Sequence, residues 1–123
     1  KRLVVRLIID RKDLIDTISN FKKQGFSYLV KILGIDYIDY ISVLYILRNL
    51  DSDEEIEIEV HLNQNDLWVP TIINIFKGAD WYERELYEMF GIEIKGRKVR
   101  KLLLEKFSEN IYPLRKSFKW GTK

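Results

Sequence analysis

Four acidic residues lie close together in the second half of this chain, and carboxylates can take part in catalysis. Asp80, Glu83, Glu85 and Glu88 could act as general acids and bases. Their spacing indicates a helix instead, because Asp80 and Glu83 form a D-x-x-E capping box and Gly91 follows as a stop. Negative charge is also favoured at a helix start. We therefore predict structural or partner-facing roles for these acids, and no catalysis.

The rest of the chain offers little for catalysis or metal binding. His61 is the single histidine and falls on the polar side of an alternating pattern, so we expect an exposed strand residue. Without cysteine, this chain alone cannot form a disulfide, a thiolate zinc site or a Cys-ligated iron–sulfur cluster. The six glycines follow no phosphate-binding pattern. We expect no catalytic, cofactor or metal site.

Charge is divided unevenly along the 123 residues. Residues 1–94 carry eleven basic and seventeen acidic side chains, a net −6, whereas residues 95–123 carry ten basic and two acidic ones, a net +8. A basic tail on an acidic body predicts an acidic partner surface, nucleic acid or anionic lipid as its target; the alternative is a solubilising tail. No signal peptide is visible, and no apolar run reaches the roughly 20 residues that span a bilayer.

Four strands are predicted from the periodicity of the apolar residues, at 3–9, 28–33, 41–47 and 56–62. The third is nearly all apolar, which indicates a central strand, and it forms a hairpin with the fourth. The fourth alternates, so its polar side with Glu57, Glu59 and His61 should face water. Residues 34–40 should form an irregular connection, and residues 63–79 a loop with a helical turn at 71–76.

The first predicted helix covers residues 11–24. Asp10 is its expected N-cap, Asp13 stands at the capping-box position and Gly25 supplies the stop. Together the elements indicate an α+β fold: a mostly antiparallel sheet of about four strands with helices packed on one face. We assign this domain to residues 1–94, and an extended basic arm to residues 95–123.

The second predicted helix follows Asp80. Its apolar face should combine four residues, Tyr82, Leu86, Met89 and Phe90. Arg84 and Glu88 should pair on the other side. Aromatic residues crowd around the acid–Arg–acid triplet at 83–85, namely Trp68, Phe76, Trp81 and Tyr82. This composition is equally typical of an interface core and of a buried ion-pair network.

The same stretch is specific enough to indicate a family. The run A-D-W-Y-E-R-E-L-Y-E-M-F-G-I at 79–92, preceded by V-P-T-I at 69–72, resembles the 30 kDa subunit family of respiratory NADH dehydrogenase (complex I). The homologous subunit of membrane-bound energy-converting NiFe hydrogenases carries the same signature. Residues 96–104 resemble a shortened G-H-P-D-L-R-R-I-L stretch, and residues 112–116 the H-P-L-R-K-D element. Arg97-Lys98 departs from the expected His-Pro.

The resemblance implies a non-catalytic structural subunit of a membrane-associated electron-transfer complex, either NADH:quinone oxidoreductase or a related energy-converting hydrogenase. It implies that this chain binds no cofactor, and that iron–sulfur clusters and, in the hydrogenases, the NiFe centre belong to partner subunits. The implied partners are the hydrogenase-like large (49 kDa-type) subunit and the iron–sulfur subunits. The implied location is peripheral, on the cytoplasmic side, with the membrane contacted only through the complex.

The residues expected at the partner interface or in the family signature are Asp80, Trp81, Tyr82, Glu83, Arg84, Glu85, Phe90, Gly91, Pro113, Leu114, Arg115 and Lys116. Capping and ion pairing by the residues at 80 and 83–85 should fix the junction between body and arm. Arg115 and Lys116 should anchor the arm on its partner.

A small RNA-binding α+β module that uses its basic tail is the alternative, because a β-α-β-β order with such a tail can bind RNA. It requires exposed aromatic residues beside basic ones on the central strands. The one polar strand face carries Glu57 and Glu59 instead, which repel phosphate. A free-standing enzyme is the third hypothesis, and the sequence offers no residues for its chemistry. The structural subunit, without nucleic acid as a partner, is preferred.

Overall fold

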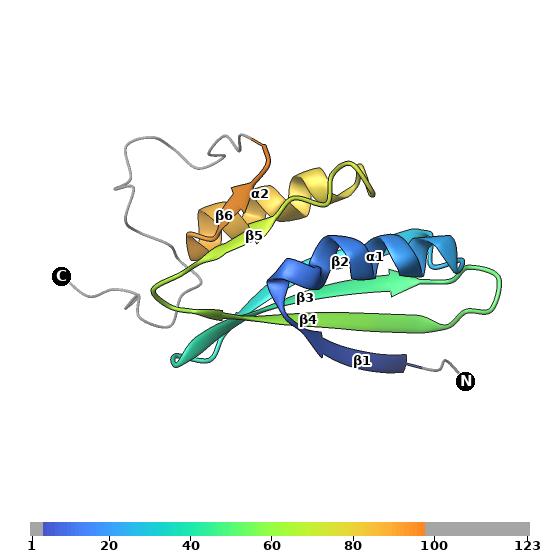
Figure 1. Ribbon diagram of the computed structural model, residues 1–123, viewed down its shortest axis with the longest axis horizontal. Helices are drawn as coiled ribbons and strands as arrows, with labels where there is room; N and C mark the ends of the chain where they lie inside the picture. Colours follow the sequence, from blue (N-terminus) through green and yellow to red (C-terminus); the bar gives the residue numbers. More distant parts are fainter. Residues whose placement is uncertain (1–3, 98–123) are drawn as a thin grey trace.

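The computed structural model describes residues 4–97. Its elements are, in chain order, β1 (Val4–Ile9), a 3₁₀ turn η1 (Arg11–Asp13), α1 (Leu14–Lys23), β2 (Tyr28–Asp36), β3 (Tyr40–Arg48), β4 (Glu55–Asn63), β5 (Trp68–Pro70), α2 (Ala79–Phe90) and β6 (Glu93–Lys95). The predicted α+β fold is confirmed (Figure 1). The predicted arm lies almost wholly outside the described residues, so it stays a prediction.

Four strands form one sheet in the order β1-β4-β3-β2. β3 is antiparallel to both of its neighbours, as expected for a hairpin-linked meander, whereas β1 joins β4 in parallel. The prediction of a central strand at 41–47 is therefore confirmed, and β1 and β2 form the two edges. Both helices lie on the same side of the sheet, and the short parallel pair β5–β6 lies beside α2 (Figure 1).

The core lies between the sheet and the helices. The alternation of β4 sends four apolar side chains to this inner side, Ile56, Ile58, Val60 and Leu62. From above the sheet, α1 contributes Leu14 and Ile18, and α2 contributes Leu86 and Phe90, all at most 5% exposed. Removing these side chains from water is the main stabilising contribution to the fold.

The first helix begins later than predicted. Asp10 caps the 3₁₀ turn η1 by accepting a hydrogen bond from the Lys12 amide at 3.5 Å, and α1 starts only at Leu14. Asp13 stands at the N-cap of α1 and makes no side-chain capping bond, so its predicted capping-box role is wrong. Gly25 has a φ of +104°, which confirms it as the residue that ends the helical segment.

β2 runs three residues further than predicted. Residues 34–36 continue the ladder against residues 41–43 of β3, so the irregular connection shrinks to 37–39. Gly34 obscures the strand pattern because glycine has no side chain to show periodicity. Its identity is set by α2: a Cβ at this position would lie 2.8 Å from Cε2 of Phe90.

The predicted loop at 63–79 contains a strand that the sequence does not reveal. β5 is only three residues long and ends in Pro70, and it pairs with β6 in parallel. The helical turn predicted at 71–76 is confirmed, because the Phe76 amide donates to the Ile72 carbonyl at 2.9 Å. We refer to residues 68–97 as the α2 region.

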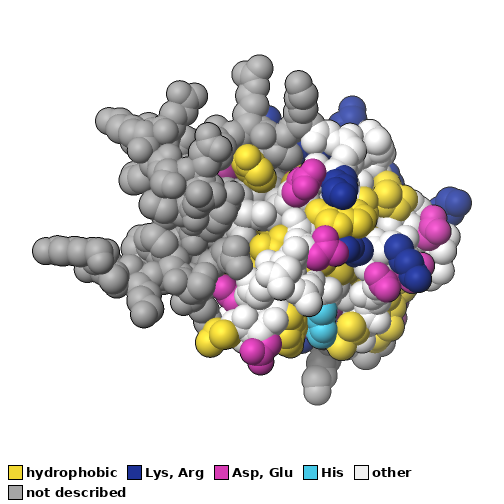
Figure 2. All heavy atoms as spheres, turned by 60° about the vertical axis from the view of Figure 1, so that its left-hand side comes forward, with side chains coloured by type: hydrophobic (Ala, Val, Ile, Leu, Met, Phe, Trp, Pro, Cys, Tyr) yellow, Lys and Arg dark blue, Asp and Glu magenta, His cyan; other side chains and the backbone are white. Residues whose placement is uncertain are grey.

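The outer face of the sheet is less open to water than predicted. Glu57 is partly buried beside Arg6, and Glu59 is only 7% exposed, so the prediction of a wholly wet face is wrong. The histidine, cyan in Figure 2, does reach the surface, and acidic and basic side chains alternate with apolar ones on the described part of this view. No helix of the described residues is long and apolar enough to cross a membrane.

Candidate functional site

The two sides of helix α2 have different surroundings. Glu83, Leu86 and Phe90 point into the fold and are at most 5% exposed, whereas Trp81 is 57% exposed. A helix over residues 79–90 can divide its side chains in this way because positions three and four apart share a face. The stretch at 79–92 that resembles the family signature therefore has one side buried in the fold and one side exposed to water.

The start of α2 differs from the prediction. The N-cap position is Gly78, no side chain caps the helix, and Asp80 lies inside the first turn. The predicted capping box of Asp80 and Glu83 is wrong, because Glu83 is engaged elsewhere. The predicted stop is confirmed: Gly91 adopts a φ of +75°, a left-handed conformation that favours glycine.

Glu83 is the centre of a buried polar network. Its side chain is 0% exposed, and it accepts hydrogen bonds from the Thr71 hydroxyl at 2.7 Å, the Ile72 amide at 2.8 Å and Nη1 of Arg97 at 3.3 Å. Burial raises the pKa of Glu83 above its ordinary value, although these three donors act to lower it. One carboxylate thus ties the loop after β5 and the segment after β6 to the helix.

Arg97 extends this network to the surface. Its Nη2 contacts the carboxylate of Asp80, which also accepts from Nε of Arg84 at 3.2 Å. The hydrogen bond from Arg97 holds the pKa of Asp80 below its ordinary value. Arg84 therefore pairs with Asp80 and not, as predicted, with Glu88. The sequence left two interpretations of the acid–Arg–acid triplet at 83–85, an interface core and a buried ion-pair network. For Glu83 the structure shows the buried ion-pair network.

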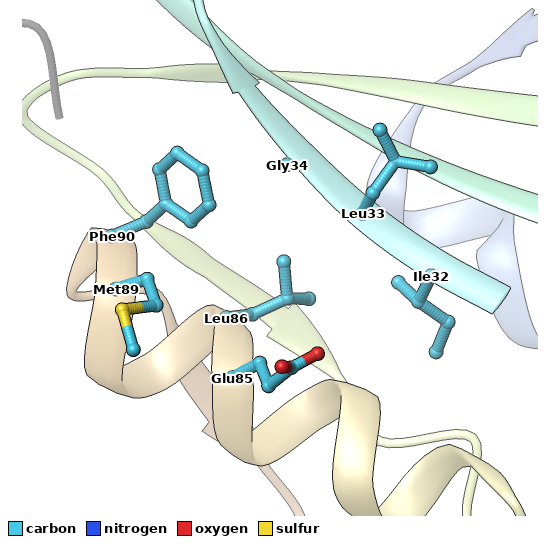
Figure 3. Close-up of a pocket in the computed structure, with 7 residues that line it drawn as sticks. All are labelled: Ile32, Leu33, Gly34, Glu85, Leu86, Met89 and Phe90. Atoms are coloured by element: carbon cyan, nitrogen blue, oxygen red, sulfur yellow. The ribbon is translucent and has the colours of Figure 1, made fainter. Parts of the chain in front are cut away.

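Helix α2 rests against edge strand β2. The Tyr82 hydroxyl donates to the Val30 carbonyl at 3.0 Å. A cleft of about 130 Å³ lies between helix and strand, and Figure 3 shows the residues around it: Ile32, Leu33, Gly34, Glu85, Leu86, Met89 and Phe90. Its volume is below the roughly 300–1,000 Å³ typical of small-molecule pockets. Glu85 is its single charged residue, so the cleft fits a packing surface better than a substrate site.

β5 is held in place by two cations. The guanidinium of Arg11 lies 4.0 Å and Nζ of Lys95 lies 4.2 Å from the ring centroid of Trp68. Arg11 also donates to the carbonyl of Asp66 at 2.9 Å. Cation–π contacts at sites as open to water as this one stabilise by about 0.5–1 kcal/mol each. Trp68, which the sequence grouped with candidate interface aromatics, thus has an internal role.

A second charged cluster lies on the outer face of the sheet. Glu59 accepts from the Ser42 hydroxyl at 2.7 Å, meets Nε2 of His61 at 2.7 Å and lies 3.7 Å from Nη1 of Arg6. Burial alone would raise the pKa of Glu59, but the hydrogen bonds from Ser42 and His61 and the nearby positive charge bring it below its ordinary value. No group of three or more potential metal ligands occurs within residues 4–97.

The structure brings together part of the predicted set. Asp80, Glu83 and Arg84 belong to one network with Arg97, and Tyr82, Glu85 and Phe90 lie against β2. Thr71 and Arg97 are missed by sequence reasoning, because no periodic pattern links them to Glu83. Four predicted residues lie outside the described part of the chain, namely Pro113, Leu114, Arg115 and Lys116.

Comparisons with known proteins give one consistent family. Residues 7–123 match the family described as respiratory-chain NADH dehydrogenase, 30 Kd subunit. The C/D subunit of NADH-quinone oxidoreductase from Acinetobacter baumannii (strain AYE) is 46% identical over 78 residues, which cover 63% of this chain and 13% of that protein. The corresponding C-type protein of Neorickettsia sennetsu is 31% identical over 110 residues, covering 87% of this chain and 59% of that protein. The chain therefore spans less than two thirds of these curated relatives.

Two solved structures share the fold. A chain described as Nqo5 of the trypsin-resistant fragment (1–134) has a TM-score of 0.72 at 25% identity, and the match covers 77% of this chain and 81% of that one. A chain of the membrane-bound sulfane sulfur reductase, an archaeal respiratory membrane complex, has a TM-score of 0.88 at 20% identity. This match covers 98% of the present chain and 74% of that one.

Proposed function

This chain belongs to the family of the respiratory-chain NADH dehydrogenase 30 Kd subunit, and on that premise we propose that it is a non-catalytic structural subunit of a membrane-associated electron-transfer complex. The complex is NADH:quinone oxidoreductase or a related energy-converting hydrogenase. The chain packs against the hydrogenase-like large subunit and the iron–sulfur subunits. The iron–sulfur clusters and, in a hydrogenase, the NiFe centre are carried by those partners, on the cytoplasmic side of the membrane.

The observation that carries this proposal is the exposure of Trp81. Its side chain is 57% exposed on a helix whose other side is fully packed. A large aromatic group in water is a typical centre of a protein interface, and polar groups typically surround it. Asp80 and Arg84 supply such a rim, with side chains 43% and 31% exposed.

The α2 network supports a further part of the proposal, the placement of the arm. Arg97 follows β6 closely, and its bonds to Asp80 and Glu83 hold this segment against α2, where the proposed arm begins. The basic residues beyond it suit an acidic partner surface, on which Arg115 and Lys116 anchor the arm.

The charge of the outer sheet face speaks against the RNA-binding alternative. On the central strands this face carries Glu57 and Glu59 from β4 beside Leu44 and Ile46 from β3. RNA-binding sheets present exposed aromatic rings and cations at such positions, because bases stack and phosphates are anionic. Glu57, Glu59, Leu44 and Ile46 offer neither a ring nor a cation at these four positions.

Affinity purification of the tagged chain from its native cells tests the proposal. We expect Trp81→Ala to reduce recovery of the large subunit about 30-fold, the effect of losing a hot-spot residue of about 2 kcal/mol. Leu50→Ala is the matched control, because Leu50 is 63% exposed at the β3–β4 turn. Equal recovery with both variants would contradict the proposed interface. Normal assembly combined with failed electron transfer would contradict the structural role.

A further inference from the structure

Edge strand β2 has a stretch of unpaired backbone beside helix α2. Within residues 4–97 β2 pairs only with β3, and the Tyr82 hydroxyl donates to the Val30 carbonyl near the start of the strand. The usual protections of an edge, a bulge and a lysine, also lie in this first part, at 29–31. Apart from the β3 ladder, no hydrogen bond within residues 4–97 involves the backbone of residues 32–35. Because alternate residues of an edge strand turn their amide and carbonyl groups away from the sheet, this stretch can accept a further strand.

The cleft between α2 and β2 opens on this stretch. Ile32 and Gly34 point to the inner side of the sheet and Leu33 points to the outer side. All three line the cleft (Figure 3). A cleft lined from both faces of one strand lies at the edge of that strand, because neighbouring side chains alternate between the faces. A strand added here would place its inward side chains against Leu86 and Met89.

The cleft has room for one side chain. A cavity of about 150 Å³ holds a benzene molecule, so the volume of about 130 Å³ suits a leucine, isoleucine or methionine side chain. The floor is apolar, since Ile32, Leu86 and Phe90 are at most 5% exposed. Met89 is partly exposed at the side, and a methionine side chain adapts its shape to what it contacts.

Glu85 adds a charge to the cleft. Its side chain is partly buried, and within residues 4–97 it takes part in no hydrogen bond or ion pair. The adjacent cation, Arg84, is bound to Asp80 at 3.2 Å. A partly desolvated carboxylate favours a positive partner. Side chains two residues apart on a strand share a face about 6–7 Å apart, so a lysine or arginine two residues from the inserted side chain would reach Glu85.

The β2 strand of a second copy is a poor occupant of the cleft. In each copy Ile32 is 3% exposed, and Gly34 lies directly against the ring of Phe90. The inward side of that strand is therefore already covered by its own α2 and has no side chain to insert. The site suits an extended segment of a different polypeptide.

We propose that the cleft between α2 and β2 binds an extended segment of another protein, which lies along residues 32–35 as a further strand. The segment inserts one leucine, isoleucine or methionine between β2 and α2 and places a lysine or arginine two residues away, beside Glu85. Trp81 precedes Glu85 by one turn of α2, so the segment adjoins the proposed interface. In naming a partner subunit as the source of the segment, the proposal rests on the proposed function.

Binding of synthetic peptides to the full-length chain, measured by calorimetry, tests the proposal. The probe is a short threonine-rich peptide with a single leucine. A lysine stands two positions before the leucine in one version and two positions after it in another, one for each strand direction. We expect one version to bind, and binding to fall about tenfold or more when the leucine is replaced by alanine or when alternate peptide nitrogens are methylated.

Equal binding of the alanine or the methylated peptide would overturn the proposal. Failure of both lysine versions would overturn it as well, since the cleft would then be closed or filled by the chain itself. A dimer in sedimentation that Glu85→Lys dissociates would identify a second copy as the occupant, with the same consequence.

An exchange of charges locates the site. Glu85→Lys should weaken binding of the lysine peptide about tenfold and strengthen binding of the same peptide with glutamate in place of lysine. Glu93→Lys makes the same change of net charge at an exposed position on β6 and should leave both affinities unchanged. If the two variants act alike, or if the glutamate peptide does not gain affinity, the cleft is not the site.

The peptides and the affinity purification separate this inference from the proposed function. If the peptides fail but Trp81→Ala still reduces recovery of the large subunit, the inference alone is overturned. If the lysine peptide binds and depends on Glu85 but Trp81→Ala recovers the large subunit like the wild type, the proposed interface is contradicted and the cleft site stands.

Discussion

Two carboxylates of this protein are withdrawn from water on opposite sides of the sheet, with opposite consequences. Glu83, in the α2 region, has a side chain 0% exposed and a raised pKa; Glu59, on the outer face of β4, has a side chain 9% exposed and a lowered pKa. Complete desolvation prevails at Glu83, whereas hydrogen bonds and a nearby cation prevail at Glu59. The two acids also differ in their structural roles. Glu83 connects short segments that have few backbone hydrogen bonds between strands, whereas Glu59 lies on β4, which is hydrogen-bonded along its length to β1 and β3.

The largest expected effect is the loss of stability when Glu83 is removed. Glu83→Ala leaves the Thr71 hydroxyl, the Ile72 amide and Arg97 without their acceptor in a buried site, so we expect about 3–5 kcal/mol less free energy of unfolding. Glu59→Ala, the matched change on the sheet, should cost about 1–2 kcal/mol. Urea unfolding measures both. Equal losses would show that the two carboxylates contribute equally to the fold.

A smaller loss is expected at the contact between the α2 region and the sheet. Gly34→Ala places a Cβ 2.8 Å from the Phe90 ring, and overpacking of this kind costs about 1–3 kcal/mol. Phe90→Leu in the same chain should restore part of the loss. Gly78→Ala is the control, because nothing lies within 4 Å of a Cβ there. If Gly34→Ala unfolds like the wild type, the helix does not depend on this contact.

The dependence of stability on pH should separate the two carboxylates by its sign. The folded pKa of Glu83 is raised, so protonation of Glu83 favours the folded state. This pH-linked part of the stability is present below the ordinary value of 4.5 and is lost as pH rises through the folded pKa. The folded pKa of Glu59 is lowered, so its contribution is present above 4.5 and is lost as pH falls. Urea unfolding at a series of pH values measures the free energy of unfolding of the wild type and of the variants Glu83→Gln and Glu59→Gln, which lack the titrating group. Parallel curves for the wild type and Glu83→Gln would contradict the raised pKa.

The smallest effect on stability is expected at Trp81. Because this side chain is 57% exposed, Trp81→Ala should change the free energy of unfolding of the isolated chain by no more than about 0.5 kcal/mol. Thermal unfolding measures this change in stability. It should be small, whereas the same variant is expected to recover much less of the large subunit. A much larger destabilisation would place Trp81 in the fold of the α2 region and remove it from the proposed interface.

Prediction from the sequence succeeded where buried apolar residues recur at regular spacing or form a continuous run. The alternation at 56–62 and the apolar run at 41–47 predicted the strands and the central place of β3 correctly. It failed at β5, because three residues ending in proline carry too little pattern. It also shortened β2 at Gly34, whose role depends on a ring from a distant helix.

Charged residues of the candidate site were harder to predict for a related reason. Periodicity indicates which face of an element is buried, but it does not indicate the partner of a polar group. Glu83 finds its partners at Thr71 and Arg97, twelve and fourteen residues away, through the path of the chain between short segments. A local capping box was the natural interpretation from spacing alone, and tertiary contacts replaced it.

The parallel pairing of β1 with β4 has a consequence for the order of folding. Val4 meets Glu55 only after the whole β2–β3–β4 meander has brought β4 into place. Closing so long a loop costs entropy that the local hairpins do not incur, so β1 should be the last strand to attach and the first to detach. A newly made chain would thus hold a three-stranded sheet with β4 at its open edge before the N-terminal strand completes it.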